Sequence, residues 1–339
     1  MVVRRVGRIL LKLGAALIVI IVALVGFSYY NAKKYDVPGP DPRDPTVAMA
    51  EGNVDRVEGE YLNGFYYHAK GTPHPGTVVV FGGSEGSAAH RDAVQIRERG
   101  YNVLSLYFFG QPNQQQLLDE VPLDFFNEVL DWIRANDDID APLTVIGSSK
   151  GAELTANLAA RYPEIDNIVL YTPGEYTYQS LSFDKGEPTS SFTYEGRPVD
   201  FLAFKGSFID FLPTMTRFLL NLPVSFRGDY EKAIAEADNA DAARIDLSKF
   251  EGHGLLFAGE QDRMWPGEQA ARNLADQNPQ LEAVVFEDAG HVFLEDMDEL
   301  GPVWPTMLGG TLEGNKKAKI ESDKLLYERL EQWHSMPAN

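Results

Sequence analysis

The stretch Leu143–Pro163, LTVIGSSKGAELTANLAARYP, joins a run of apolar residues to a pattern with helical spacing. Only the five residues GSSKG, 147–151, separate the two halves. A strand that passes into a helix through G-x-S-x-G is typical of a nucleophile elbow, a strained turn that lifts the serine above a sheet. Its glycines leave room for strand and helix to approach, and the first helical N–H groups can bind an oxyanion. The stretch therefore predicts an α/β fold with Ser149 as a nucleophile.

Short β-branched runs alternate with helix-length segments along the rest of the chain. We expect strands at 77–83, 101–109, 142–148, 167–173, 254–262 and 282–291. Helical spacing occurs at 88–99, 122–136, 150–162, 267–277 and 316–333. Nearly continuous apolarity indicates strands covered on both faces, and the alternation implies right-handed crossovers in a doubly wound, mostly parallel sheet. An antiparallel pair at 57–70, turning at Asn63-Gly64, is expected to precede this sheet.

One interval is longer than a single crossover needs, since roughly eighty residues separate the strands that begin at 167 and 254. We expect an insertion over 175–250. Part of it, 201–226, is rich in Phe and Leu. Two compatible interpretations are extra helices that pack on the core and a lid over the crevice at the strand ends, where open α/β sheets bind ligands.

A serine hydroxyl needs a base to take its proton. The chain offers six candidates, namely His68, His74, His90, His253, His291 and His334. His291 follows AVVFEDAG, just past the carboxyl end of the last predicted strand and on the same sheet edge as Ser149. Its position therefore makes His291 the predicted catalytic base.

The imidazolium that forms needs an acidic partner that also fixes its tautomer. Asp262 ends LLFAGEQD, one strand before His291, and the order Ser149, Asp262, His291 is the one expected for this architecture. Asp262 could instead cap a helix that starts at Pro266. A rival acid is Glu175, after NIVLYTPG. We predict a Ser149–His291–Asp262 triad.

A second oxyanion donor should come from FGGSEGS, residues 81–87, whose glycines let backbone approach a substrate closely. A phosphate-binding loop is not favoured, because no Walker-type lysine follows and GGSEG is not G-x-G-x-x-G. The oxyanion hole is therefore assigned to the N–H of Lys150 together with that of Gly83 or Ser84.

The Lys150 side chain raises a separate question, since a cation at a helix amino terminus opposes the helix dipole. Glu153, three residues later, could offset its charge. Alternatively, the ammonium could contact Glu85 or a substrate anion, which makes Lys150 and Glu85 possible substrate contacts.

The amino terminus predicts a membrane anchor. Residues 1–12 are basic, 13–32 carry no charge and are long enough to cross a hydrocarbon layer of ~30 Å, and 33–50 are rich in proline. Tyr29 and Tyr30 stand where interfacial aromatic residues are expected. A cleaved signal peptide is the alternative, although no small-x-small site follows. The basic residues before the span favour an extracytoplasmic domain over 51–339, while Lys33 and Lys34 after it weaken that orientation.

Composition excludes several classes of function. A formal charge of −20 argues against a nucleic-acid partner, because phosphate binding needs clustered Lys and Arg. The absence of Cys excludes disulfides, thiolate catalysis and Cys-ligated metals. We expect no metal and no cofactor, and nothing in the sequence sets the oligomeric state.

The chain resembles α/β-hydrolases, and more narrowly the carboxy-terminal catalytic domain of acyl-CoA thioester hydrolases and bile acid-CoA:amino acid N-acyltransferases. The similar segments, within roughly 60–300, are GSSKGAEL, VVVFGGSEGS, YNVLSLYFFG, VPLDFFNEVLDWI, GEQDRMWP and AGHVF. The resemblance implies hydrolysis of a small-molecule acyl thioester or carboxylic ester through an acyl-enzyme on Ser149. Transfer to an amine is the family's other activity. Its transferases typically carry Cys as nucleophile, so Ser149 favours hydrolysis.

Two features depart from that family. An anchor and spacer occupy the place of its amino-terminal β-sandwich, and an extracytoplasmic domain would not meet cytoplasmic CoA. Either the topology is inverted or the substrate is an extracellular acyl ester, lipid or peptide-like amide. A lipase or peptidase of the same fold and a non-catalytic binding protein are the remaining alternatives.

Overall fold

The computed structural model describes residues 2–37, 39, 41–49, 52–137, 141–182, 185–206 and 208–335. Within these residues the main sheet has eight strands in the order β1-β2-β4-β3-β6-β7-β10-β11. The strands are β1 Val54–Glu58, β2 Asn63–Tyr67, β3 Thr77–Phe81, β4 Asn102–Leu106, β6 Leu143–Ser148, β7 Asn167–Tyr171, β10 His253–Gly259 and β11 Leu281–Phe286. From β4 to β11 neighbouring strands pair in parallel, whereas β1 and β2 are antiparallel to their neighbours. The predicted mostly parallel sheet is confirmed.

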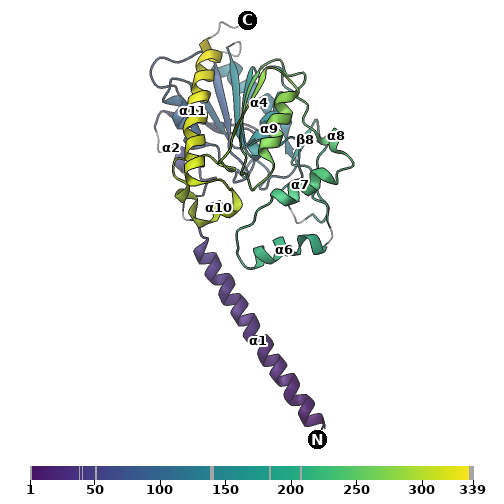
Figure 1. Ribbon diagram of the computed structural model, residues 1–339. Helices are drawn as coiled ribbons and strands as arrows, with labels where there is room; N and C mark the ends of the chain where they lie inside the picture. Colours follow the sequence, from purple (N-terminus) through teal and green to yellow (C-terminus); the bar gives the residue numbers. More distant parts are fainter. Residues whose placement is uncertain are drawn as a thin grey trace.

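Helices cover both faces of this sheet (Figure 1). One apolar cluster joins the strands to α4 Phe126–Asn136, α5 Lys150–Ala159 and α9 Gly267–Asp276. A second cluster, on the other face, includes residues of α3 His90–Arg97 and α11 Leu312–Ser335. Strands buried on both faces explain the nearly continuous apolar runs in the sequence. Shorter elements are α2 Thr46–Met49, η1 Leu123–Phe125, η2 Met297–Val303 and α10 Trp304–Met307.

The predicted turn of the first hairpin was wrong. Asn63 and Gly64 lie inside β2, and the chain reverses at 59–62, where the Gly59 N–H donates to the Leu62 carbonyl at 2.8 Å. The reason is tertiary packing. A Cβ at position 64 would stand 2.2 Å from the Ser105 carbonyl oxygen, so Gly64 permits close approach of β4 and is not needed for a turn.

The long interval between β7 and β10 forms the expected insertion. It contains β8 Phe192–Tyr194, β9 Arg197–Pro198, α6 Phe208–Leu219, α7 Arg227–Ala235 and α8 Ala240–Ala243. Strands β8 and β9 make a small sheet with β5 Val121–Pro122. A separate apolar cluster links the insertion to the loop after β10, and its members are Tyr176, Tyr178, Leu202, Tyr230, Ala243 and Trp265. Helix α6 lies below α7, on the side of the domain from which α1 projects (Figure 1).

The amino-terminal segment is one helix, α1 Val2–Lys34, which projects from the domain (Figure 1). Its part Leu10–Lys34 is long enough and apolar enough to cross a membrane, with a mean hydropathy of 2.7 in an 18-residue window of which no residue is buried. The same length and composition fit a signal sequence, the alternative stated above. Of the proline-rich segment, Pro38 and Pro40 lie outside the described residues.

Candidate active site

Ser149 occupies a strained turn between β6 and α5. Its φ of 54° and ψ of −119° are a conformation that L residues rarely adopt. A Cβ at Gly147 would lie 2.1 Å from the Gly151 carbonyl oxygen, and one at Gly151 would lie 2.0 Å from that of Gly82. The two glycines therefore allow strand, helix and neighbouring loop to meet around Ser149. The strained elbow is as the sequence predicts.

A line of hydrogen bonds joins three side chains from distant parts of the chain. Ser149 Oγ lies 2.8 Å from His291 Nε2, and His291 Nδ1 lies 2.7 Å from Asp262 Oδ2. Because an ionised carboxylate can only accept, Nδ1 carries the donated proton and Nε2 is free to accept one from the serine. His291 and Asp262 are both buried, with Asp262 only 1% exposed, whereas Ser149 is half-buried.

Backbone and aromatic contacts hold the two loops in place. The other carboxylate oxygen of Asp262 accepts N–H bonds from Met264 at 2.7 Å and Trp265 at 3.3 Å. The Trp265 ring stands edge-on to the His291 ring, with centroids 5.5 Å apart. The His291 N–H donates to the Leu308 carbonyl at 2.8 Å. These contacts fix the imidazole and the carboxylate relative to each other before any substrate binds.

The insertion is tied to the same acid loop through Arg227. Its guanidinium donates to the Asp262 carbonyl at 3.0 Å and makes a two-pronged contact with the Glu268 carboxylate at 2.6 and 3.1 Å. The Ser225 hydroxyl adds a bond of 2.7 Å to the Arg263 carbonyl. Sequence reasoning missed this role of Arg227, because a long-range contact leaves no local pattern.

Glu175, the rival acid, contacts residues other than His291. It is buried, pairs with Arg244 and accepts a bond of 2.7 Å from the Asn273 side chain. The remaining histidines also have other partners. Those contacts are Asp55 for His68, the Tyr101 ring for His74, Tyr67 for His90, the Trp333 ring for His253, and Thr144 with Pro75 for His334. The structure therefore brings His291 and Asp262, not their rivals, to Ser149.

The glycine loop 81–87 lies against the elbow, since a Cβ at Gly83 would approach the Ser149 Cβ to 3.2 Å. In this structure the Gly83 N–H donates to both oxygens of the Glu85 carboxylate, each at 3.0 Å. The Glu85 carboxylate also accepts from the Ser87 hydroxyl at 2.5 Å. The Gly83 N–H, one of the two donors predicted from this loop, is therefore bonded to a carboxylate in this structure.

Lys150 is buried, with 2% of its side chain exposed. Its ammonium donates to Glu153 at 2.6 Å and to the Ser191 hydroxyl at 2.8 Å. Burial lowers the pKa of the Lys150 ammonium and raises the pKa of the Glu153 carboxyl, and their mutual attraction opposes both changes. The pairing with Glu153 thus accounts for Lys150, whose ammonium makes its described bonds with residues other than Glu85.

Two further features that hold the loops of Asp262 and His291 were not predicted from the sequence. Gly309 and Gly310 adopt φ values of 79° and 75° and pair with the loops of Asp262 and His291 through isolated bridges to Asp262 and Ala289. The Asn315 side chain accepts from the Gly290 N–H at 2.7 Å. A Gly-Gly pair is a local signal for positive φ, but nothing local indicates which loop it meets.

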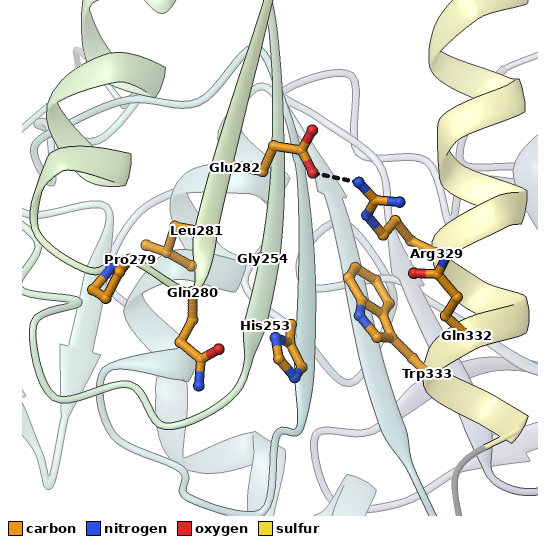
Figure 2. Close-up of a pocket in the computed structure, with 9 residues that line it drawn as sticks. All are labelled: His253, Gly254, Pro279, Gln280, Leu281, Glu282, Arg329, Gln332 and Trp333. Carbon is orange, nitrogen blue, oxygen red and sulfur yellow. Dashed lines mark hydrogen bonds and ion pairs between the residues drawn. The ribbon is translucent and has the colours of Figure 1, made fainter.

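A cavity of about 280 Å³ lies at the opposite edge of the sheet, at the amino ends of β10 and β11. Figure 2 shows its lining, with the Arg329 guanidinium from α11 directed at the Glu282 carboxylate and the Trp333 ring beside His253. Ser149 is absent from that lining. Parallel α/β sheets carry their reactive groups at the carboxyl ends of the strands, so we place the candidate site at Ser149 and not at this cavity.

No metal site emerges from the described part of the chain, where no three His, Asp or Glu side chains gather in a way that could hold an ion.

The strand order, the elbow and a similar solved structure define the fold class. An esterase structure from Pyrococcus furiosus superposes over 88% of this chain and 98% of its own, with a TM-score of 0.50 at 16% sequence identity. Likeness at that identity concerns the fold alone. The domain has the α/β-hydrolase fold.

Residues 121–295, more than half of the chain, match the family described as BAAT / acyl-CoA thioester hydrolase C terminal. The chain belongs to this family, as its resemblance indicated. Human acyl-coenzyme A thioesterase 6 is 29% identical over 29% of this chain and 23% of its own length. Rat acyl-coenzyme A amino acid N-acyltransferase 2 is 31% identical over 36% of this chain and 28% of its own. The chain thus spans only about a quarter of the length of these relatives.

Proposed function

We propose that this protein is a serine hydrolase that cleaves an acyl thioester or carboxylic ester through an acyl-enzyme on Ser149. The observation that carries the proposal is the continuous hydrogen-bonded line from Ser149 through His291 to Asp262. Its order along the chain and its position at the carboxyl edge of the sheet fit acyl-transfer chemistry. No cofactor is required for this reaction.

In the proposed first step, His291 Nε2 takes the hydroxyl proton while Ser149 Oγ attacks the acyl carbonyl carbon. The buried Asp262 carboxylate balances the charge of the imidazolium and holds its orientation. Collapse of the tetrahedral intermediate breaks the bond to the leaving group, which receives the proton from His291. In the second step, His291 takes a proton from water while the water oxygen attacks the acyl carbon. Collapse of this intermediate breaks the bond to Ser149 Oγ, which receives the proton from His291, and the carboxylic acid is released.

The proposed oxyanion hole uses the N–H of Lys150, the first residue of α5, whose amide has no partner within the helix by its position. The second donor is the N–H of Gly83 or Ser84. The bond from the Gly83 N–H to the Glu85 carboxylate supports an anion-binding role for this loop. A substrate oxyanion would accept a hydrogen bond from the same N–H in the same way. For Gly83 to act as the donor, Glu85 has to be displaced first.

Family membership supports an acyl thioester or ester as the substrate class. Transfer of the acyl group to an amine is the second candidate, favoured by the 31% identity to the rat N-acyltransferase. The two differ only in what attacks the acyl-enzyme, water or an amine.

We further propose that α1 anchors the protein in a membrane, with the domain over 51–339 outside the cytoplasm and the insertion over 175–250 acting as a lid. The uncharged stretch at 13–32 and the exposed apolar surface of α1 support the anchor. The contacts of Arg227 and Ser225 with the Asp262 loop support the lid, because they join the insertion to the loop that carries the proposed acid.

The test is covalent labelling by a fluorophosphonate, followed by identification of the modified peptide. We expect one modification, at Ser149, and none in Ser149→Ala. A panel of p-nitrophenyl esters and acyl-CoAs, with and without glycine as an amine acceptor, then separates ester from thioester cleavage and hydrolysis from transfer. Labelling at another serine, or no labelling of the folded protein, would refute the proposal.

A further inference from the structure

Helix α6 carries an exposed apolar face. Leu212, Met215 and Leu219 follow the three- and four-residue spacing that places side chains on one side of a helix. They are 46%, 43% and 75% exposed, and the neighbouring Phe218 is 58% exposed. Soluble monomers rarely gather large apolar side chains at such exposure on one short helix, and such patches mark interaction surfaces.

The carboxyl end of α6 is bonded to the last turns of α1. The Ser28 hydroxyl donates to the Leu219 carbonyl at 3.0 Å, and the Asn31 amide donates to the Leu220 carbonyl at 2.9 Å. The Asn221 amide returns a bond of 2.8 Å to the Ser28 hydroxyl. Figure 1 shows α6 beside this end of α1, on the side of the domain from which α1 projects.

These bonds set the depth of α6 relative to the apolar part of α1. Ser28 lies inside the uncharged stretch 13–32 and stands six residues before Lys34, or about 9 Å along a helix axis. Tyr29 and Tyr30, at the same level, are exposed and are of the type enriched where hydrocarbon meets headgroups. A membrane crossed by α1 would therefore have its surface at the level of α6.

We propose that the apolar face of α6 is seated in the interfacial layer of the lipid bilayer that α1 crosses. This inference rests on the proposed membrane anchoring. The occupant is lipid because the bonds from Ser28 and Asn31 hold the end of α6 beside the apolar helix α1. Amphipathic helices bury apolar faces at the boundary between headgroups and acyl chains. Residues 222–227 lead directly from α6 to the Asp262 loop, so the rim of the Ser149 site then lies close to the bilayer surface.

The chain has no cysteine, which permits a direct test in the full-length protein. Single Met215→Cys and Leu219→Cys variants receive a nitroxide label and are reconstituted in vesicles of phosphatidylcholine and phosphatidylglycerol. Two controls are Leu17→Cys, exposed in the middle of α1, and Ile320→Cys, exposed on α11. The readout is collision of the nitroxide with oxygen, which concentrates in lipid, and with a water-soluble nickel complex.

We expect collisions with oxygen to dominate for labels at 215, 219 and 17, and collisions with the nickel complex to dominate for the label at 320. Nickel dominance at 215 and 219 with oxygen dominance at 17 would overturn the α6 inference and leave the anchor intact. Low access of both reagents to labels at 215 and 219 would also overturn the α6 inference, because it would show that protein covers these side chains. Nickel dominance at 17 would overturn the anchor and the α6 inference together.

Discussion

The Lys150 ammonium lies 2.6 Å from the Glu153 carboxylate, and both side chains are almost fully buried. Lys150 directly follows the strained Ser149. The other Glu153 oxygen accepts from the Tyr178 N–H at 2.9 Å, which ties the insertion to α5. Removing one member of a buried ion pair leaves the other charge buried without a partner, which lowers the free energy of unfolding by about 3–5 kcal/mol.

We therefore expect Lys150→Met to lower the free energy of unfolding by about 3 kcal/mol or more. The double variant Lys150→Met with Glu153→Gln should recover most of that loss, because the glutamine is neutral and its amide oxygen still accepts from Tyr178. Denaturant unfolding at neutral pH measures both. Equal losses in the single and double variants would show that the charge pairing is not the cause.

His291→Ala and Asp262→Asn should both lower kcat strongly, because each interrupts the proposed proton route. Loss of the base removes most of the nucleophile's reactivity, so we expect kcat to fall by up to about 10⁶-fold in His291→Ala. An amide at 262 favours the wrong imidazole tautomer, so we expect a fall of roughly 10⁴-fold in Asp262→Asn. Steady-state kinetics on a p-nitrophenyl ester measures this. Glu175→Gln is the matched control, and an equal loss of kcat there would reinstate Glu175 as the acid.

Glu85→Gln should raise the turnover of neutral esters. The charged carboxylate holds the Gly83 N–H through charge-assisted bonds, which are about twice as strong as neutral ones. Weakening them by about 1 kcal/mol corresponds to a gain in kcat/KM of roughly fivefold if Gly83 is the second oxyanion donor. Glu313→Gln, an exposed site at the start of α11, is the control. An unchanged or lower kcat/KM in Glu85→Gln would assign that role to Ser84.

Gly151→Ala should damage both stability and activity. The added Cβ would stand 2.0 Å from the Gly82 carbonyl oxygen, so the loop 81–87 has to move away from Ser149. Such overpacking costs about 1–3 kcal/mol, and a shift of about 1 Å in a catalytic group can lower kcat on the order of a hundredfold. Thermal unfolding and ester kinetics test this together.

Gly228→Ala provides the control for that substitution. Gly228 lies in α7 with no other atom within 4 Å of an added Cβ, so alanine there should stabilise the protein by about 0.5 kcal/mol and leave kcat unchanged. A kcat unaffected in Gly151→Ala would mean that the contact between the elbow and the loop does not position the site.

The sequence was sufficient to predict the Ser149, His291 and Asp262 cluster because parallel strands end at a common edge. Residues that directly follow β6, β10 and β11 must lie near one another once these strands pair. Their positions just after the predicted strands selected His291 and Asp262, and the chain order agreed with that choice. Helix α5 was equally predictable, because its start coincides with the elbow.

Contacts between distant segments were not predictable. The Asn63-Gly64 pair is a typical hairpin turn, yet packing of Gly64 against Ser105 places it inside β2. The bonds of Arg227 to the Asp262 loop and of Glu85 to Gly83 depend on side-chain positions that no periodicity encodes. The Phe- and Leu-rich stretch 201–226 predicted extra helices on the core or a lid, and it did not indicate which of its side chains are exposed.

His334 should make the protein sensitive to acid. Its Nδ1 donates to the Pro75 carbonyl at 2.7 Å, and its Nε2 lies 2.9 Å from the Thr144 hydroxyl, which can donate to it. The Asn167 amide also donates to the Thr144 oxygen, at 3.2 Å, so this arrangement suits a neutral imidazole. Burial lowers the pKa of His334 from 6.5 to about 4.

Because the folded pKa is below the unfolded one, the unfolded chain binds the extra proton first as the pH falls. Stability from this site is complete above about pH 6.5 and is lost progressively down to about pH 4, by about 3 kcal/mol in total. His334→Gln keeps a donor for the Pro75 carbonyl but does not titrate. Its stability at pH 7 should be lower than that of the natural protein, while its further loss between pH 6.5 and 4 should be smaller. Unfolding by denaturant across this range measures the difference, and parallel curves for the two proteins would show that His334 does not bind the acid-destabilising proton.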